Sequence, residues 1–320
     1  MTIQVPLQEG LQIPLVELDL PLFKAAGVKV SLLRLDETHP QISGNKWFKL
    51  KYNLEAARES GVRQMLSFGG AWSNHIHALA FAGMQQGLKT IGVIRGERPV
   101  ELSATLKDAK NWGMHLHFVS RLQYRDKYGA KFQEQLRERF GGYQLIPEGG
   151  SNALAVKGCS ELVALIDQQC SEYDLICCAC GTGATLAGII AGKRSAVEVL
   201  GFPVLKGGEF LYEDISRLLV ESGVSDPGGW RLQLDAHEGG YARLSPALAD
   251  CLVRFIGATG IELEPVYTGK VMLALERMLA GGELPSGSRV VMIHSGGMQG
   301  LRGMREKLAN QLNRFKNIQL

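Results

Sequence analysis

The chain has 320 residues, of which 45% are hydrophobic, and a formal net charge of +3. This length suits one large or two medium-sized domains, and the near balance of charge, without a basic stripe interleaved with aromatics, excludes nucleic acid as an expected partner. No apolar run reaches the roughly 18 residues that a membrane span needs, and the first residues lack the basic and apolar regions of a secretory signal. We therefore expect a cytoplasmic protein.

Short apolar runs alternate with helical patterns along most of the chain. The predicted strands cover residues 63–68, 90–95, 114–119, 143–147, 174–180, 197–202 and 289–294. Most of these runs are continuous rather than alternating, which is typical of strands buried on both faces. Helices are predicted over 74–86, ending at Gly87, and over 270–282. Strands that alternate with helices predict parallel α/β sheets.

The first candidate for chemistry is the stretch SGNKWFKLK, in which Gly44 and Asn45 directly precede Lys46. A turn that ends in this pair would present Lys46 at the start of a helix. The simple interpretation is a surface lysine, and the alternative is a lysine whose amine reacts. Lys49 and Lys51 follow on the same helix, where we expect them to face solvent or a partner.

The run FGGAWSNHIHALA follows the predicted strand 63–68. Ser73 is a natural helix N-cap, and the amides of Asn74 and His75 would then point out of the helix start, where a carboxylate could bind. Ser73 could also act as a cap alone, and both roles can coexist. His75 and His77 are two residues apart, so they point to different sides of the helix and do not predict a shared metal.

The run CGTGATLAG follows the predicted strand 174–180, and Gly181 and Gly183 allow close approach of a ligand to the backbone. A dinucleotide fingerprint would have a third glycine where Leu186 stands, and the Gly-Lys-Ser/Thr of a P-loop is absent. Either a phosphate site or an ordinary strand-to-helix turn fits this run. The amides that could bind a phosphate are those of Thr182, Gly183, Ala184 and Thr185.

Six cysteines occur, and three of them crowd into the run ICCAC just before this turn. Cys177 and Cys180 have the C-x2-C spacing of a zinc site, but no second pair of ligands follows at the right spacing. We therefore expect no metal, and we expect these thiols to be small buried hydrophobes in a reduced protein.

The run LEPVYTGK places Tyr267 and Thr268 before the helix predicted over 270–282. Alone, it predicts a buried tyrosine and a capping threonine. Together, a phosphate turn, a carboxylate cradle and a lysine presented by a turn point to pyridoxal 5′-phosphate. This cofactor carries a phosphate, binds a lysine amine covalently and acts on amino acids, which bring a carboxylate.

In combination, SGNKWFKLKYNL, SFGGAWSNHIHALA, CGTGATLAG, LEPVYTGK and VVMIHSGG resemble the fold-type-II pyridoxal-phosphate enzymes. They are most similar to the group of 1-aminocyclopropane-1-carboxylate deaminase and D-cysteine desulfhydrase. The resemblance implies a two-domain α/β fold of the tryptophan synthase β type, with the site in the cleft between the domains. The large domain would comprise residues 1–47 and 153–320, and the small domain residues 48–152. It also implies a homodimer that acts on a small amino acid.

The resemblance implies a role for each matching position. Lys46 would bind the cofactor and move the proton at the substrate α-carbon, and Asn74 would donate a hydrogen bond to the ring oxygen of the cofactor. The substrate carboxylate would be held by Ser73, Asn74 and His75, and the phosphate by Gly181, Thr182, Gly183, Ala184 and Thr185. Tyr241 and Tyr267 would flank the substrate.

Thr268 bears on the choice of substrate. In the cyclopropane deaminases this position resembles a glutamate in contact with the pyridine nitrogen, whereas threonine resembles the desulfhydrases. A hydroxyl gives a weaker electron sink, which suits loss of a good leaving group such as thiolate. Phe48 and His77 also depart from the family pattern, each where arginine is usual.

We therefore predict a β-eliminating lyase, with D-cysteine giving pyruvate, sulfide and ammonia. The alternatives are deamination of 1-aminocyclopropane-1-carboxylate, a β-replacement synthase of the cysteine-synthase kind, and a binding protein without catalysis.

Overall fold

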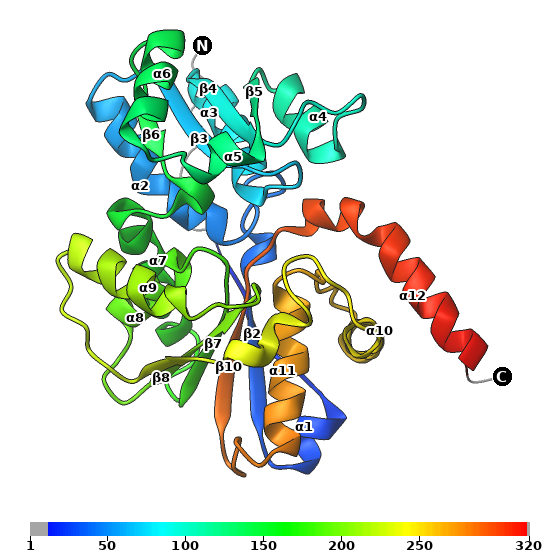
Figure 1. Ribbon diagram of the computed structural model, residues 1–320. Helices are drawn as coiled ribbons and strands as arrows, with labels where there is room; N and C mark the ends of the chain where they lie inside the picture. The colour runs from blue at the N-terminus through cyan, green and yellow to red at the C-terminus, as the bar shows by residue number, and fades with distance from the viewer. Residues whose placement is uncertain (1–11, 319–320) are drawn as a thin grey trace.

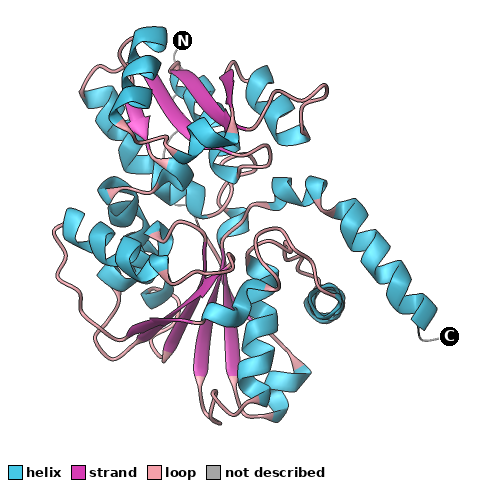
Figure 2. Cartoon of the chain, in the orientation of Figure 1, coloured by secondary structure: helices cyan, strands magenta, loops and turns pink. Residues whose placement is uncertain are grey.

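The computed structural model describes residues 12–318, and the side chains of residues 12–311. Two sheets organise the chain, one of six strands in the order β1-β2-β10-β7-β8-β9 and one of four in the order β5-β4-β3-β6 (Figures 1 and 2). All strand pairs are parallel except β1 with β2. The strands are β1 (Leu15–Glu17), β2 (Lys29–Arg34), β3 (Gln64–Gly69), β4 (Lys89–Arg95), β5 (His115–Val119), β6 (Gln144–Ile146), β7 (Leu175–Cys180), β8 (Glu198–Pro203), β9 (Trp230–Leu232) and β10 (Arg289–His294).

Helices surround both sheets, as expected for parallel strands joined by crossovers (Figure 2). The helices are α1 (Pro21–Ala25), α2 (Asn45–Glu59), α3 (Asn74–Gln86), α4 (Ala104–Asn111), α5 (Arg121–Arg125), α6 (Ala130–Phe140), α7 (Ala153–Asp167), α8 (Ala184–Gly192), α9 (Phe210–Glu221), α10 (Pro246–Thr259), α11 (Thr268–Ala280) and α12 (Arg305–Ile318). None of the helices in the described part of the chain is long and apolar enough to cross a bilayer.

Every strand predicted from the sequence forms, with ends within one residue of the prediction. The predicted helix from residue 74 is α3, and Gly87 ends it in the left-handed conformation with a φ of 65°. The three strands that were not predicted are β1, β2 and β9; β1 and β9 are the two edge strands of the larger sheet, and β2 lies between β1 and β10. Two of them have only three residues each, so they carry little pattern.

The strand β7 shows why the continuous apolar runs indicate central strands. All six of its residues are buried, because helices cover both of its faces. Cys177, Cys178 and Cys180 are at most 2% exposed and lie among the core side chains, as the sequence predicted. Burial raises the pKa of Cys180 to about 12, so these thiols are neutral.

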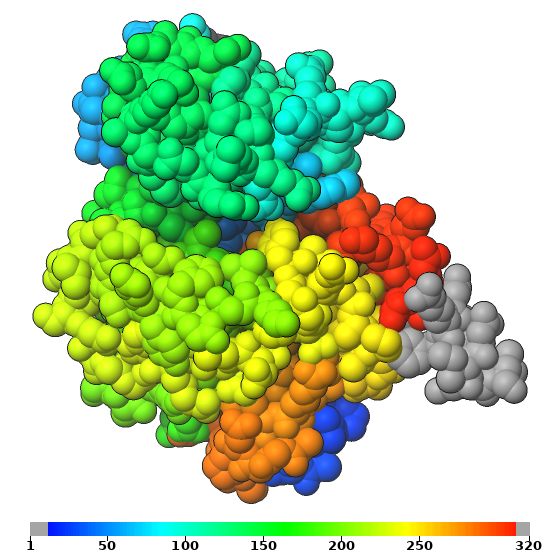
Figure 3. Space-filling view, viewed as in Figure 1, coloured from blue at the N-terminus to red at the C-terminus, as the bar shows by residue number. Residues whose placement is uncertain are grey.

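The helix α2 lies where the two sheets and their helices meet (Figure 1). Phe48 belongs to the core of the larger sheet, whereas Leu50 and Ala57 belong to the core of the smaller one. The space-filling view shows the two lobes meeting at a waist (Figure 3). We propose the domain bounds predicted above, with residues 48–152 as the small domain, and the helix α2 as the element that both domains share.

Candidate active site

A cavity of about 920 Å³ lies between the two sheets and is lined by residues of both. Its wall includes residues that follow the carboxyl ends of β3, β7 and β10, and the last residue of β4. This is the edge at which parallel α/β sheets bind ligands. The predicted site residues that line it are Lys46, Ser73, Asn74, His75, Gly181, Thr182, Gly183, Thr185, Tyr241 and Tyr267. Ala184 and Thr268 do not line it.

Lys46 stands at the second position of α2, as the Gly-Asn turn predicted. Gly44 has a φ of +74°, and a Cβ built on it would lie 1.9 Å from the Ser295 carbonyl oxygen. Only glycine therefore lets this turn approach the end of β10 so closely. The Asn45 amide donates to that same carbonyl at 3.2 Å, which fixes the start of the helix.

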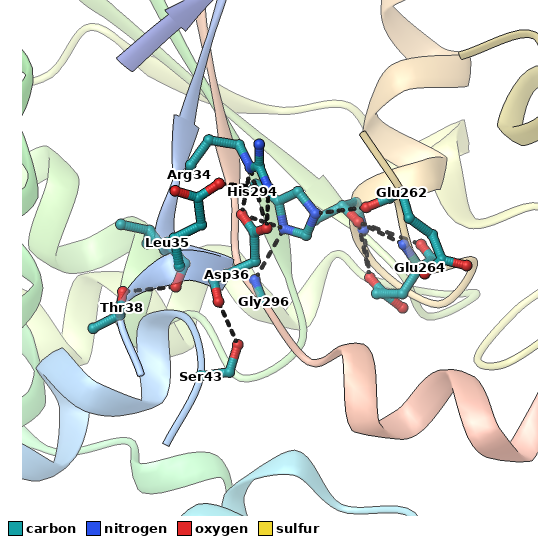
Figure 4. A network of polar contacts seen from close by, with 11 residues as sticks. Arg34, Leu35, Asp36, Thr38, Ser43, Glu262, Glu264, His294 and Gly296 are labelled. Carbon is teal, nitrogen blue, oxygen red and sulfur yellow. Dashed lines mark hydrogen bonds and ion pairs between the residues drawn. The ribbon is translucent and has the colours of Figure 1, made fainter. Parts of the chain in front are cut away.

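A polar network lies next to this turn (Figure 4). Arg34 and His294 are neighbours in register on β2 and β10, and Arg34 pairs with Asp36 at 2.6 Å. His294 donates from Nε2 to the Glu262 carbonyl at 3.0 Å. Ser43 lies 3.4 Å from the Asp36 carbonyl, so the network connects to the turn that carries Lys46.

Two lysines, not one, reach into the cavity. Lys46 and Lys49 both donate to the Gly149 carbonyl, at 3.4 and 3.3 Å. The expectation that Lys49 faces solvent is wrong, because this side chain is only 2% exposed. Burial, and then the neighbouring charge of Lys49, holds the pKa of Lys46 well below its usual value. The Lys46 amine therefore gives up its proton readily. Lys51 pairs instead with Glu161 at 2.7 Å, outside the cavity.

The start of α8 is a cradle of unused backbone donors. Its N-cap, Gly183, is in the left-handed conformation and provides no side-chain cap. Among the described residues, the amides of 182–185 have no hydrogen-bond acceptor. Buried donors of this kind require a partner, and an anion with several oxygens satisfies them. The Asn45 side chain donates to the Thr185 hydroxyl at 2.8 Å, which ties this cradle to the turn before Lys46.

The start of α3 offers a smaller cradle. Ser73 accepts a hydrogen bond from the Ile76 amide at 3.2 Å, so it is the predicted N-cap. Within the described structure, the amides of Asn74 and His75 keep no acceptor, so two donors point out of the helix. Gln299 donates to the Asn74 side-chain oxygen at 2.6 Å, which leaves the Asn74 NH₂ group available.

The two histidines of α3 point in different directions, as predicted. His75 contacts the Ser67 hydroxyl through Nε2 at 2.8 Å, and its Nδ1 is buried without a partner in the described structure. Burial, followed by the charges of both cavity lysines, holds the pKa of His75 well below its usual value. His77 lies 3.3 Å from Asp108, away from the cavity wall.

The start of α11 differs from the starts of α8 and α3. The Glu264 carboxylate accepts hydrogen bonds from the amides of Val266, Tyr267 and Thr268, at 2.7, 2.8 and 2.6 Å. Glu264 is therefore the cap, and the expectation of a capping threonine is wrong. Thr268 is fully buried, and its hydroxyl lies 3.2 Å from a carboxylate oxygen of Glu264.

The structure brings Tyr241 and Tyr267 together, with their hydroxyls 3.4 Å apart. Burial keeps the pKa of Tyr267 well above its ordinary value, so this hydroxyl stays protonated. Lys270 holds the loop of Tyr241 in place by donating to the carbonyls of His237 and Gly240, at 2.8 and 2.7 Å.

Four residues of the site or its support were missed by sequence reasoning, namely Lys49, Arg95, Glu264 and Ser295. Ser295 lines the cavity directly after β10, and its place after a predicted strand was a signal available in the sequence. Glu264 could have been found as an acidic residue shortly before a helix start. Phe48, which the resemblance marked as a departure, is buried in the core of the larger sheet and does not line the cavity.

The sequence is similar to those of known proteins over almost the whole chain. A family described as pyridoxal-phosphate dependent enzymes matches residues 7–296. A putative 1-aminocyclopropane-1-carboxylate deaminase of Thermotoga maritima is 31% identical over 88% of this chain and 93% of its own length. A bifunctional D-cysteine desulfhydrase/1-aminocyclopropane-1-carboxylate deaminase of Arabidopsis thaliana is 26% identical over 91% of this chain and 78% of its own length.

A solved structure described as a homologue of the same deaminase superposes with a TM-score of 0.83, at 28% identity and 94% coverage of both chains. The resemblance seen in the sequence is thereby confirmed, as is the fold class. The donors at the start of α8 and the buried, readily deprotonated Lys46 also fit a cofactor that has a phosphate and an aldehyde. The chain belongs to the family of pyridoxal-phosphate dependent enzymes.

Proposed function

We propose that the chain catalyses β-elimination from a β-substituted amino acid, with D-cysteine as the first substrate to test. The products would be pyruvate, sulfide and ammonia. The observation that supports this most is the convergence of Lys46, two anion cradles and a tyrosine pair on one cavity. One cradle has the capacity for a phosphate and the other for a carboxylate, as an amino-acid enzyme with this cofactor requires.

We assign the cofactor phosphate to the amides of 182–185 and to the Thr185 hydroxyl. Lys46 would hold the cofactor covalently, and Asn74 would donate to its ring oxygen. Bound there, pyridoxal phosphate supplies an electron sink for negative charge at the substrate α-carbon. Lys49 adds a second amine at the same wall, 3.3 Å from the Gly149 carbonyl.

The substrate carboxylate would bind at the start of α3. The free amides of Asn74 and His75 donate to it, and the helix dipole favours negative charge at this end. Ser73 fixes the direction of these amides by capping the helix. A carboxylate held here leaves the α-carbon to be oriented by the walls of the cavity.

Proton transfer would use Lys46 and Tyr267. A buried amine with a lowered pKa is neutral over a wider pH range, so it can accept the α-proton. The Tyr267 hydroxyl stays protonated, so it can donate to a departing thiolate. Tyr241, 3.4 Å from it, would complete the wall on this side.

Deamination of 1-aminocyclopropane-1-carboxylate is the second candidate, because two relatives carry this activity in their names. We place it second because the wall near the start of α11 is uncharged. Tyr267 and Ser295 line it, and the Glu264 carboxylate is occupied by three amides outside the lining. Thr268, the partner of the ring nitrogen that the resemblance implied, is buried outside the lining, whereas Ser295 lines it. Ser295 would therefore offer a hydroxyl to the ring nitrogen, which favours substrates with a good leaving group.

A panel of amino acids tests the proposal. D- and L-cysteine, β-chloroalanine in both forms and 1-aminocyclopropane-1-carboxylate are each incubated with the cofactor-loaded protein. We expect pyruvate from substrates with a β-thiol or β-chloro group and no 2-oxobutanoate from the cyclopropane. Efficient release of 2-oxobutanoate would contradict the proposal, and a new β-substituted product with an added nucleophile would favour a synthase. A binding protein without catalysis would give no keto acid from any substrate.

We also propose that the protein is a homodimer. Light scattering on the cofactor-loaded protein should then give about twice the 34.9 kDa of one chain. A mass near that of one chain would contradict the assembly without affecting the proposed chemistry.

A further inference from the structure

Arg95 places a positive charge at the cavity, and no acidic side chain of the described residues pairs with it. It is the last residue of β4, which runs parallel to β3 with Ile94 opposite Gly69. Arg95 therefore leaves the sheet beside the loop that leads from β3 to Ser73. A Cβ built on Gly70 would lie 3.5 Å from a guanidinium nitrogen of Arg95, so the backbone of this loop passes close to the charge.

The other cations at the open side of the cavity are already paired. These pairs are Lys127 with Glu148 at 3.2 Å, and Arg217 with Asp214 at 2.8 Å and with Glu221 at 3.1 Å. Among the residues whose side chains are described, none forms an ion pair or a hydrogen bond with the Arg95 guanidinium. It lies over the ring of Tyr124, 5.6 Å from the centroid, and a contact with the ring face leaves its N–H groups free.

Arg95 and Tyr241 both line the cavity, so the charge of Arg95 also acts on the Tyr241 side. Partial burial raises the pKa of Tyr241, and the charge of Arg95 acts in the other direction on the same hydroxyl. Arg95 is thus within electrostatic reach of Tyr241 and adjacent to the loop of the α3 cradle. A substrate with its carboxylate at that cradle would lie in the cavity that Arg95 and Tyr241 also line.

We propose that Arg95 binds a negatively charged group on the β-substituent of the substrate. The substrate class would then be small amino acids with a carboxylate, sulfinate or sulfonate on the β-carbon. This inference rests on the proposed function, because it assumes that the α-carboxylate binds at the start of α3. A planar guanidinium donates paired N–H groups to such anions, and an unpaired one has no internal competitor to displace.

A β-sulfonate would need no additional reactant for elimination. The α-proton goes to the Lys46 amine, and the electron pair it leaves forms the bond between the α- and β-carbons. The Cβ–S bond breaks with its electron pair on sulfur, and sulfite departs.

Aspartate and asparagine test the charge without depending on elimination, since they match in shape and differ in the charge of the β-substituent. Their affinities for the cofactor-loaded protein are measured by titration calorimetry, with both enantiomers. We expect aspartate to bind at least about tenfold more tightly than asparagine, as a charge-assisted contact predicts. In Arg95→Gln this ratio should fall toward one. Added salt should weaken the binding of aspartate more than the binding of asparagine.

Arg98→Gln is the matched control. Arg98 is also an exposed arginine over an aromatic ring, 5.7 Å from the Phe118 centroid, and it does not line the cavity. We expect the ratio of the affinities for aspartate and asparagine in Arg98→Gln to equal that of the unchanged protein. Equal affinity for the two amino acids, no binding of either aspartate enantiomer, or an unchanged ratio in Arg95→Gln would overturn the inference. Absence of keto acid from the β-thiol and β-chloro panel would overturn the proposed elimination instead, and the binding ratio would still report on Arg95.

Discussion

The helices α8 and α11 both begin close to the cavity, yet they treat their first amides in opposite ways. At α8 the amides of 182–185 have no acceptor within the described structure, and the cap is Gly183, which has no side chain. At α11 the Glu264 carboxylate takes up three amides before any ligand could. The difference shows that a helix start is an anion site only if the chain leaves it unfilled.

The helix α3 lies between these extremes. Ser73 takes one amide, and those of Asn74 and His75 stay free in the described structure. The number of amides taken by the chain thus decreases from α11 to α3 to α8, while the capacity for an external anion increases. This order matches a structural cap, a carboxylate and a phosphate.

The largest loss of activity should come from replacing Lys46, which lines the same cavity as the starts of α3 and α8. Lys46→Ala removes the amine that would hold the cofactor and move the α-proton, so keto-acid release should fall by about 10²- to 10⁴-fold. Stability should change little, because this side chain is not part of the apolar core. Lys51→Ala, which removes a lysine paired with Glu161 outside the cavity, should keep its activity. Equal losses in the two variants would contradict the assignment.

At the α8 start, Thr185→Val keeps the shape and removes one hydroxyl. A charge-assisted hydrogen bond is worth about 1.5–3 kcal/mol, so the affinity for pyridoxal phosphate should fall by roughly one to two orders of magnitude. Thr105→Val is the control, because the Thr105 hydroxyl is buried in α4 with no partner in the described structure. Equilibrium dialysis of the cofactor measures both variants, and unchanged affinity in Thr185→Val would place the phosphate elsewhere.

At the α11 start, Glu264→Ala should affect folding rather than cofactor binding. It leaves three amides without their acceptor, and an unsatisfied buried donor costs about 1–3 kcal/mol. We expect a loss of at least that size in the free energy of unfolding, measured with urea, while the cofactor affinity stays within a few-fold. Glu262→Ala changes an exposed neighbour and should be nearly neutral. A Glu264→Ala protein of unchanged stability would show that the carboxylate does not satisfy this helix start.

The smallest effect concerns Lys270, on the first turn of α11. Burial lowers its pKa to about 8, from an ordinary value of 10.5. Between these values the unfolded chain binds more protons than the folded one, so this lysine makes the free energy of unfolding rise with pH. The difference between the unchanged protein and Lys270→Met should therefore shift in favour of the unchanged protein from about pH 8 to 10. A difference that is flat with pH would mean that Lys270 is not perturbed.

The sequence predicts the central strands and the starts of α2 and α3 for a physical reason. Strands such as β7 are buried on both faces, which demands a continuous apolar run that can be read directly. The Gly44-Asn45 turn and the Ser73 cap are local features, set by residues that are adjacent in the chain. Such features need no knowledge of the tertiary structure.

What the sequence could not predict depends on contacts between distant segments. Lys49 is one helical turn from Lys46, and only the packing of α2 against the Gly149 loop decides that both enter the cavity. Arg95 gains its position because β3 pairs with β4, with Gly69 opposite Ile94, 25 residues later in the chain. The residue that follows each of these two, Gly70 and Arg95, lines the cavity. This pairing depends on the order of the strands in the sheet. Glu264 was visible in LEPVYTGK, but its three hydrogen bonds appear only in the folded turn.

Reduction of the cofactor-loaded protein with borohydride, followed by peptide mapping, shows which lysine holds the cofactor. The visible absorbance of the bound cofactor should bleach, and the label should be found on Lys46 in the peptide that contains GNKWFK. Lys49 is the stringent comparison, because it contacts the same Gly149 carbonyl from the same helix. A label on Lys46 alone supports the assignment of Lys46 as the residue that binds the cofactor. A label on Lys49, or no covalent label with the cofactor bound, would contradict it.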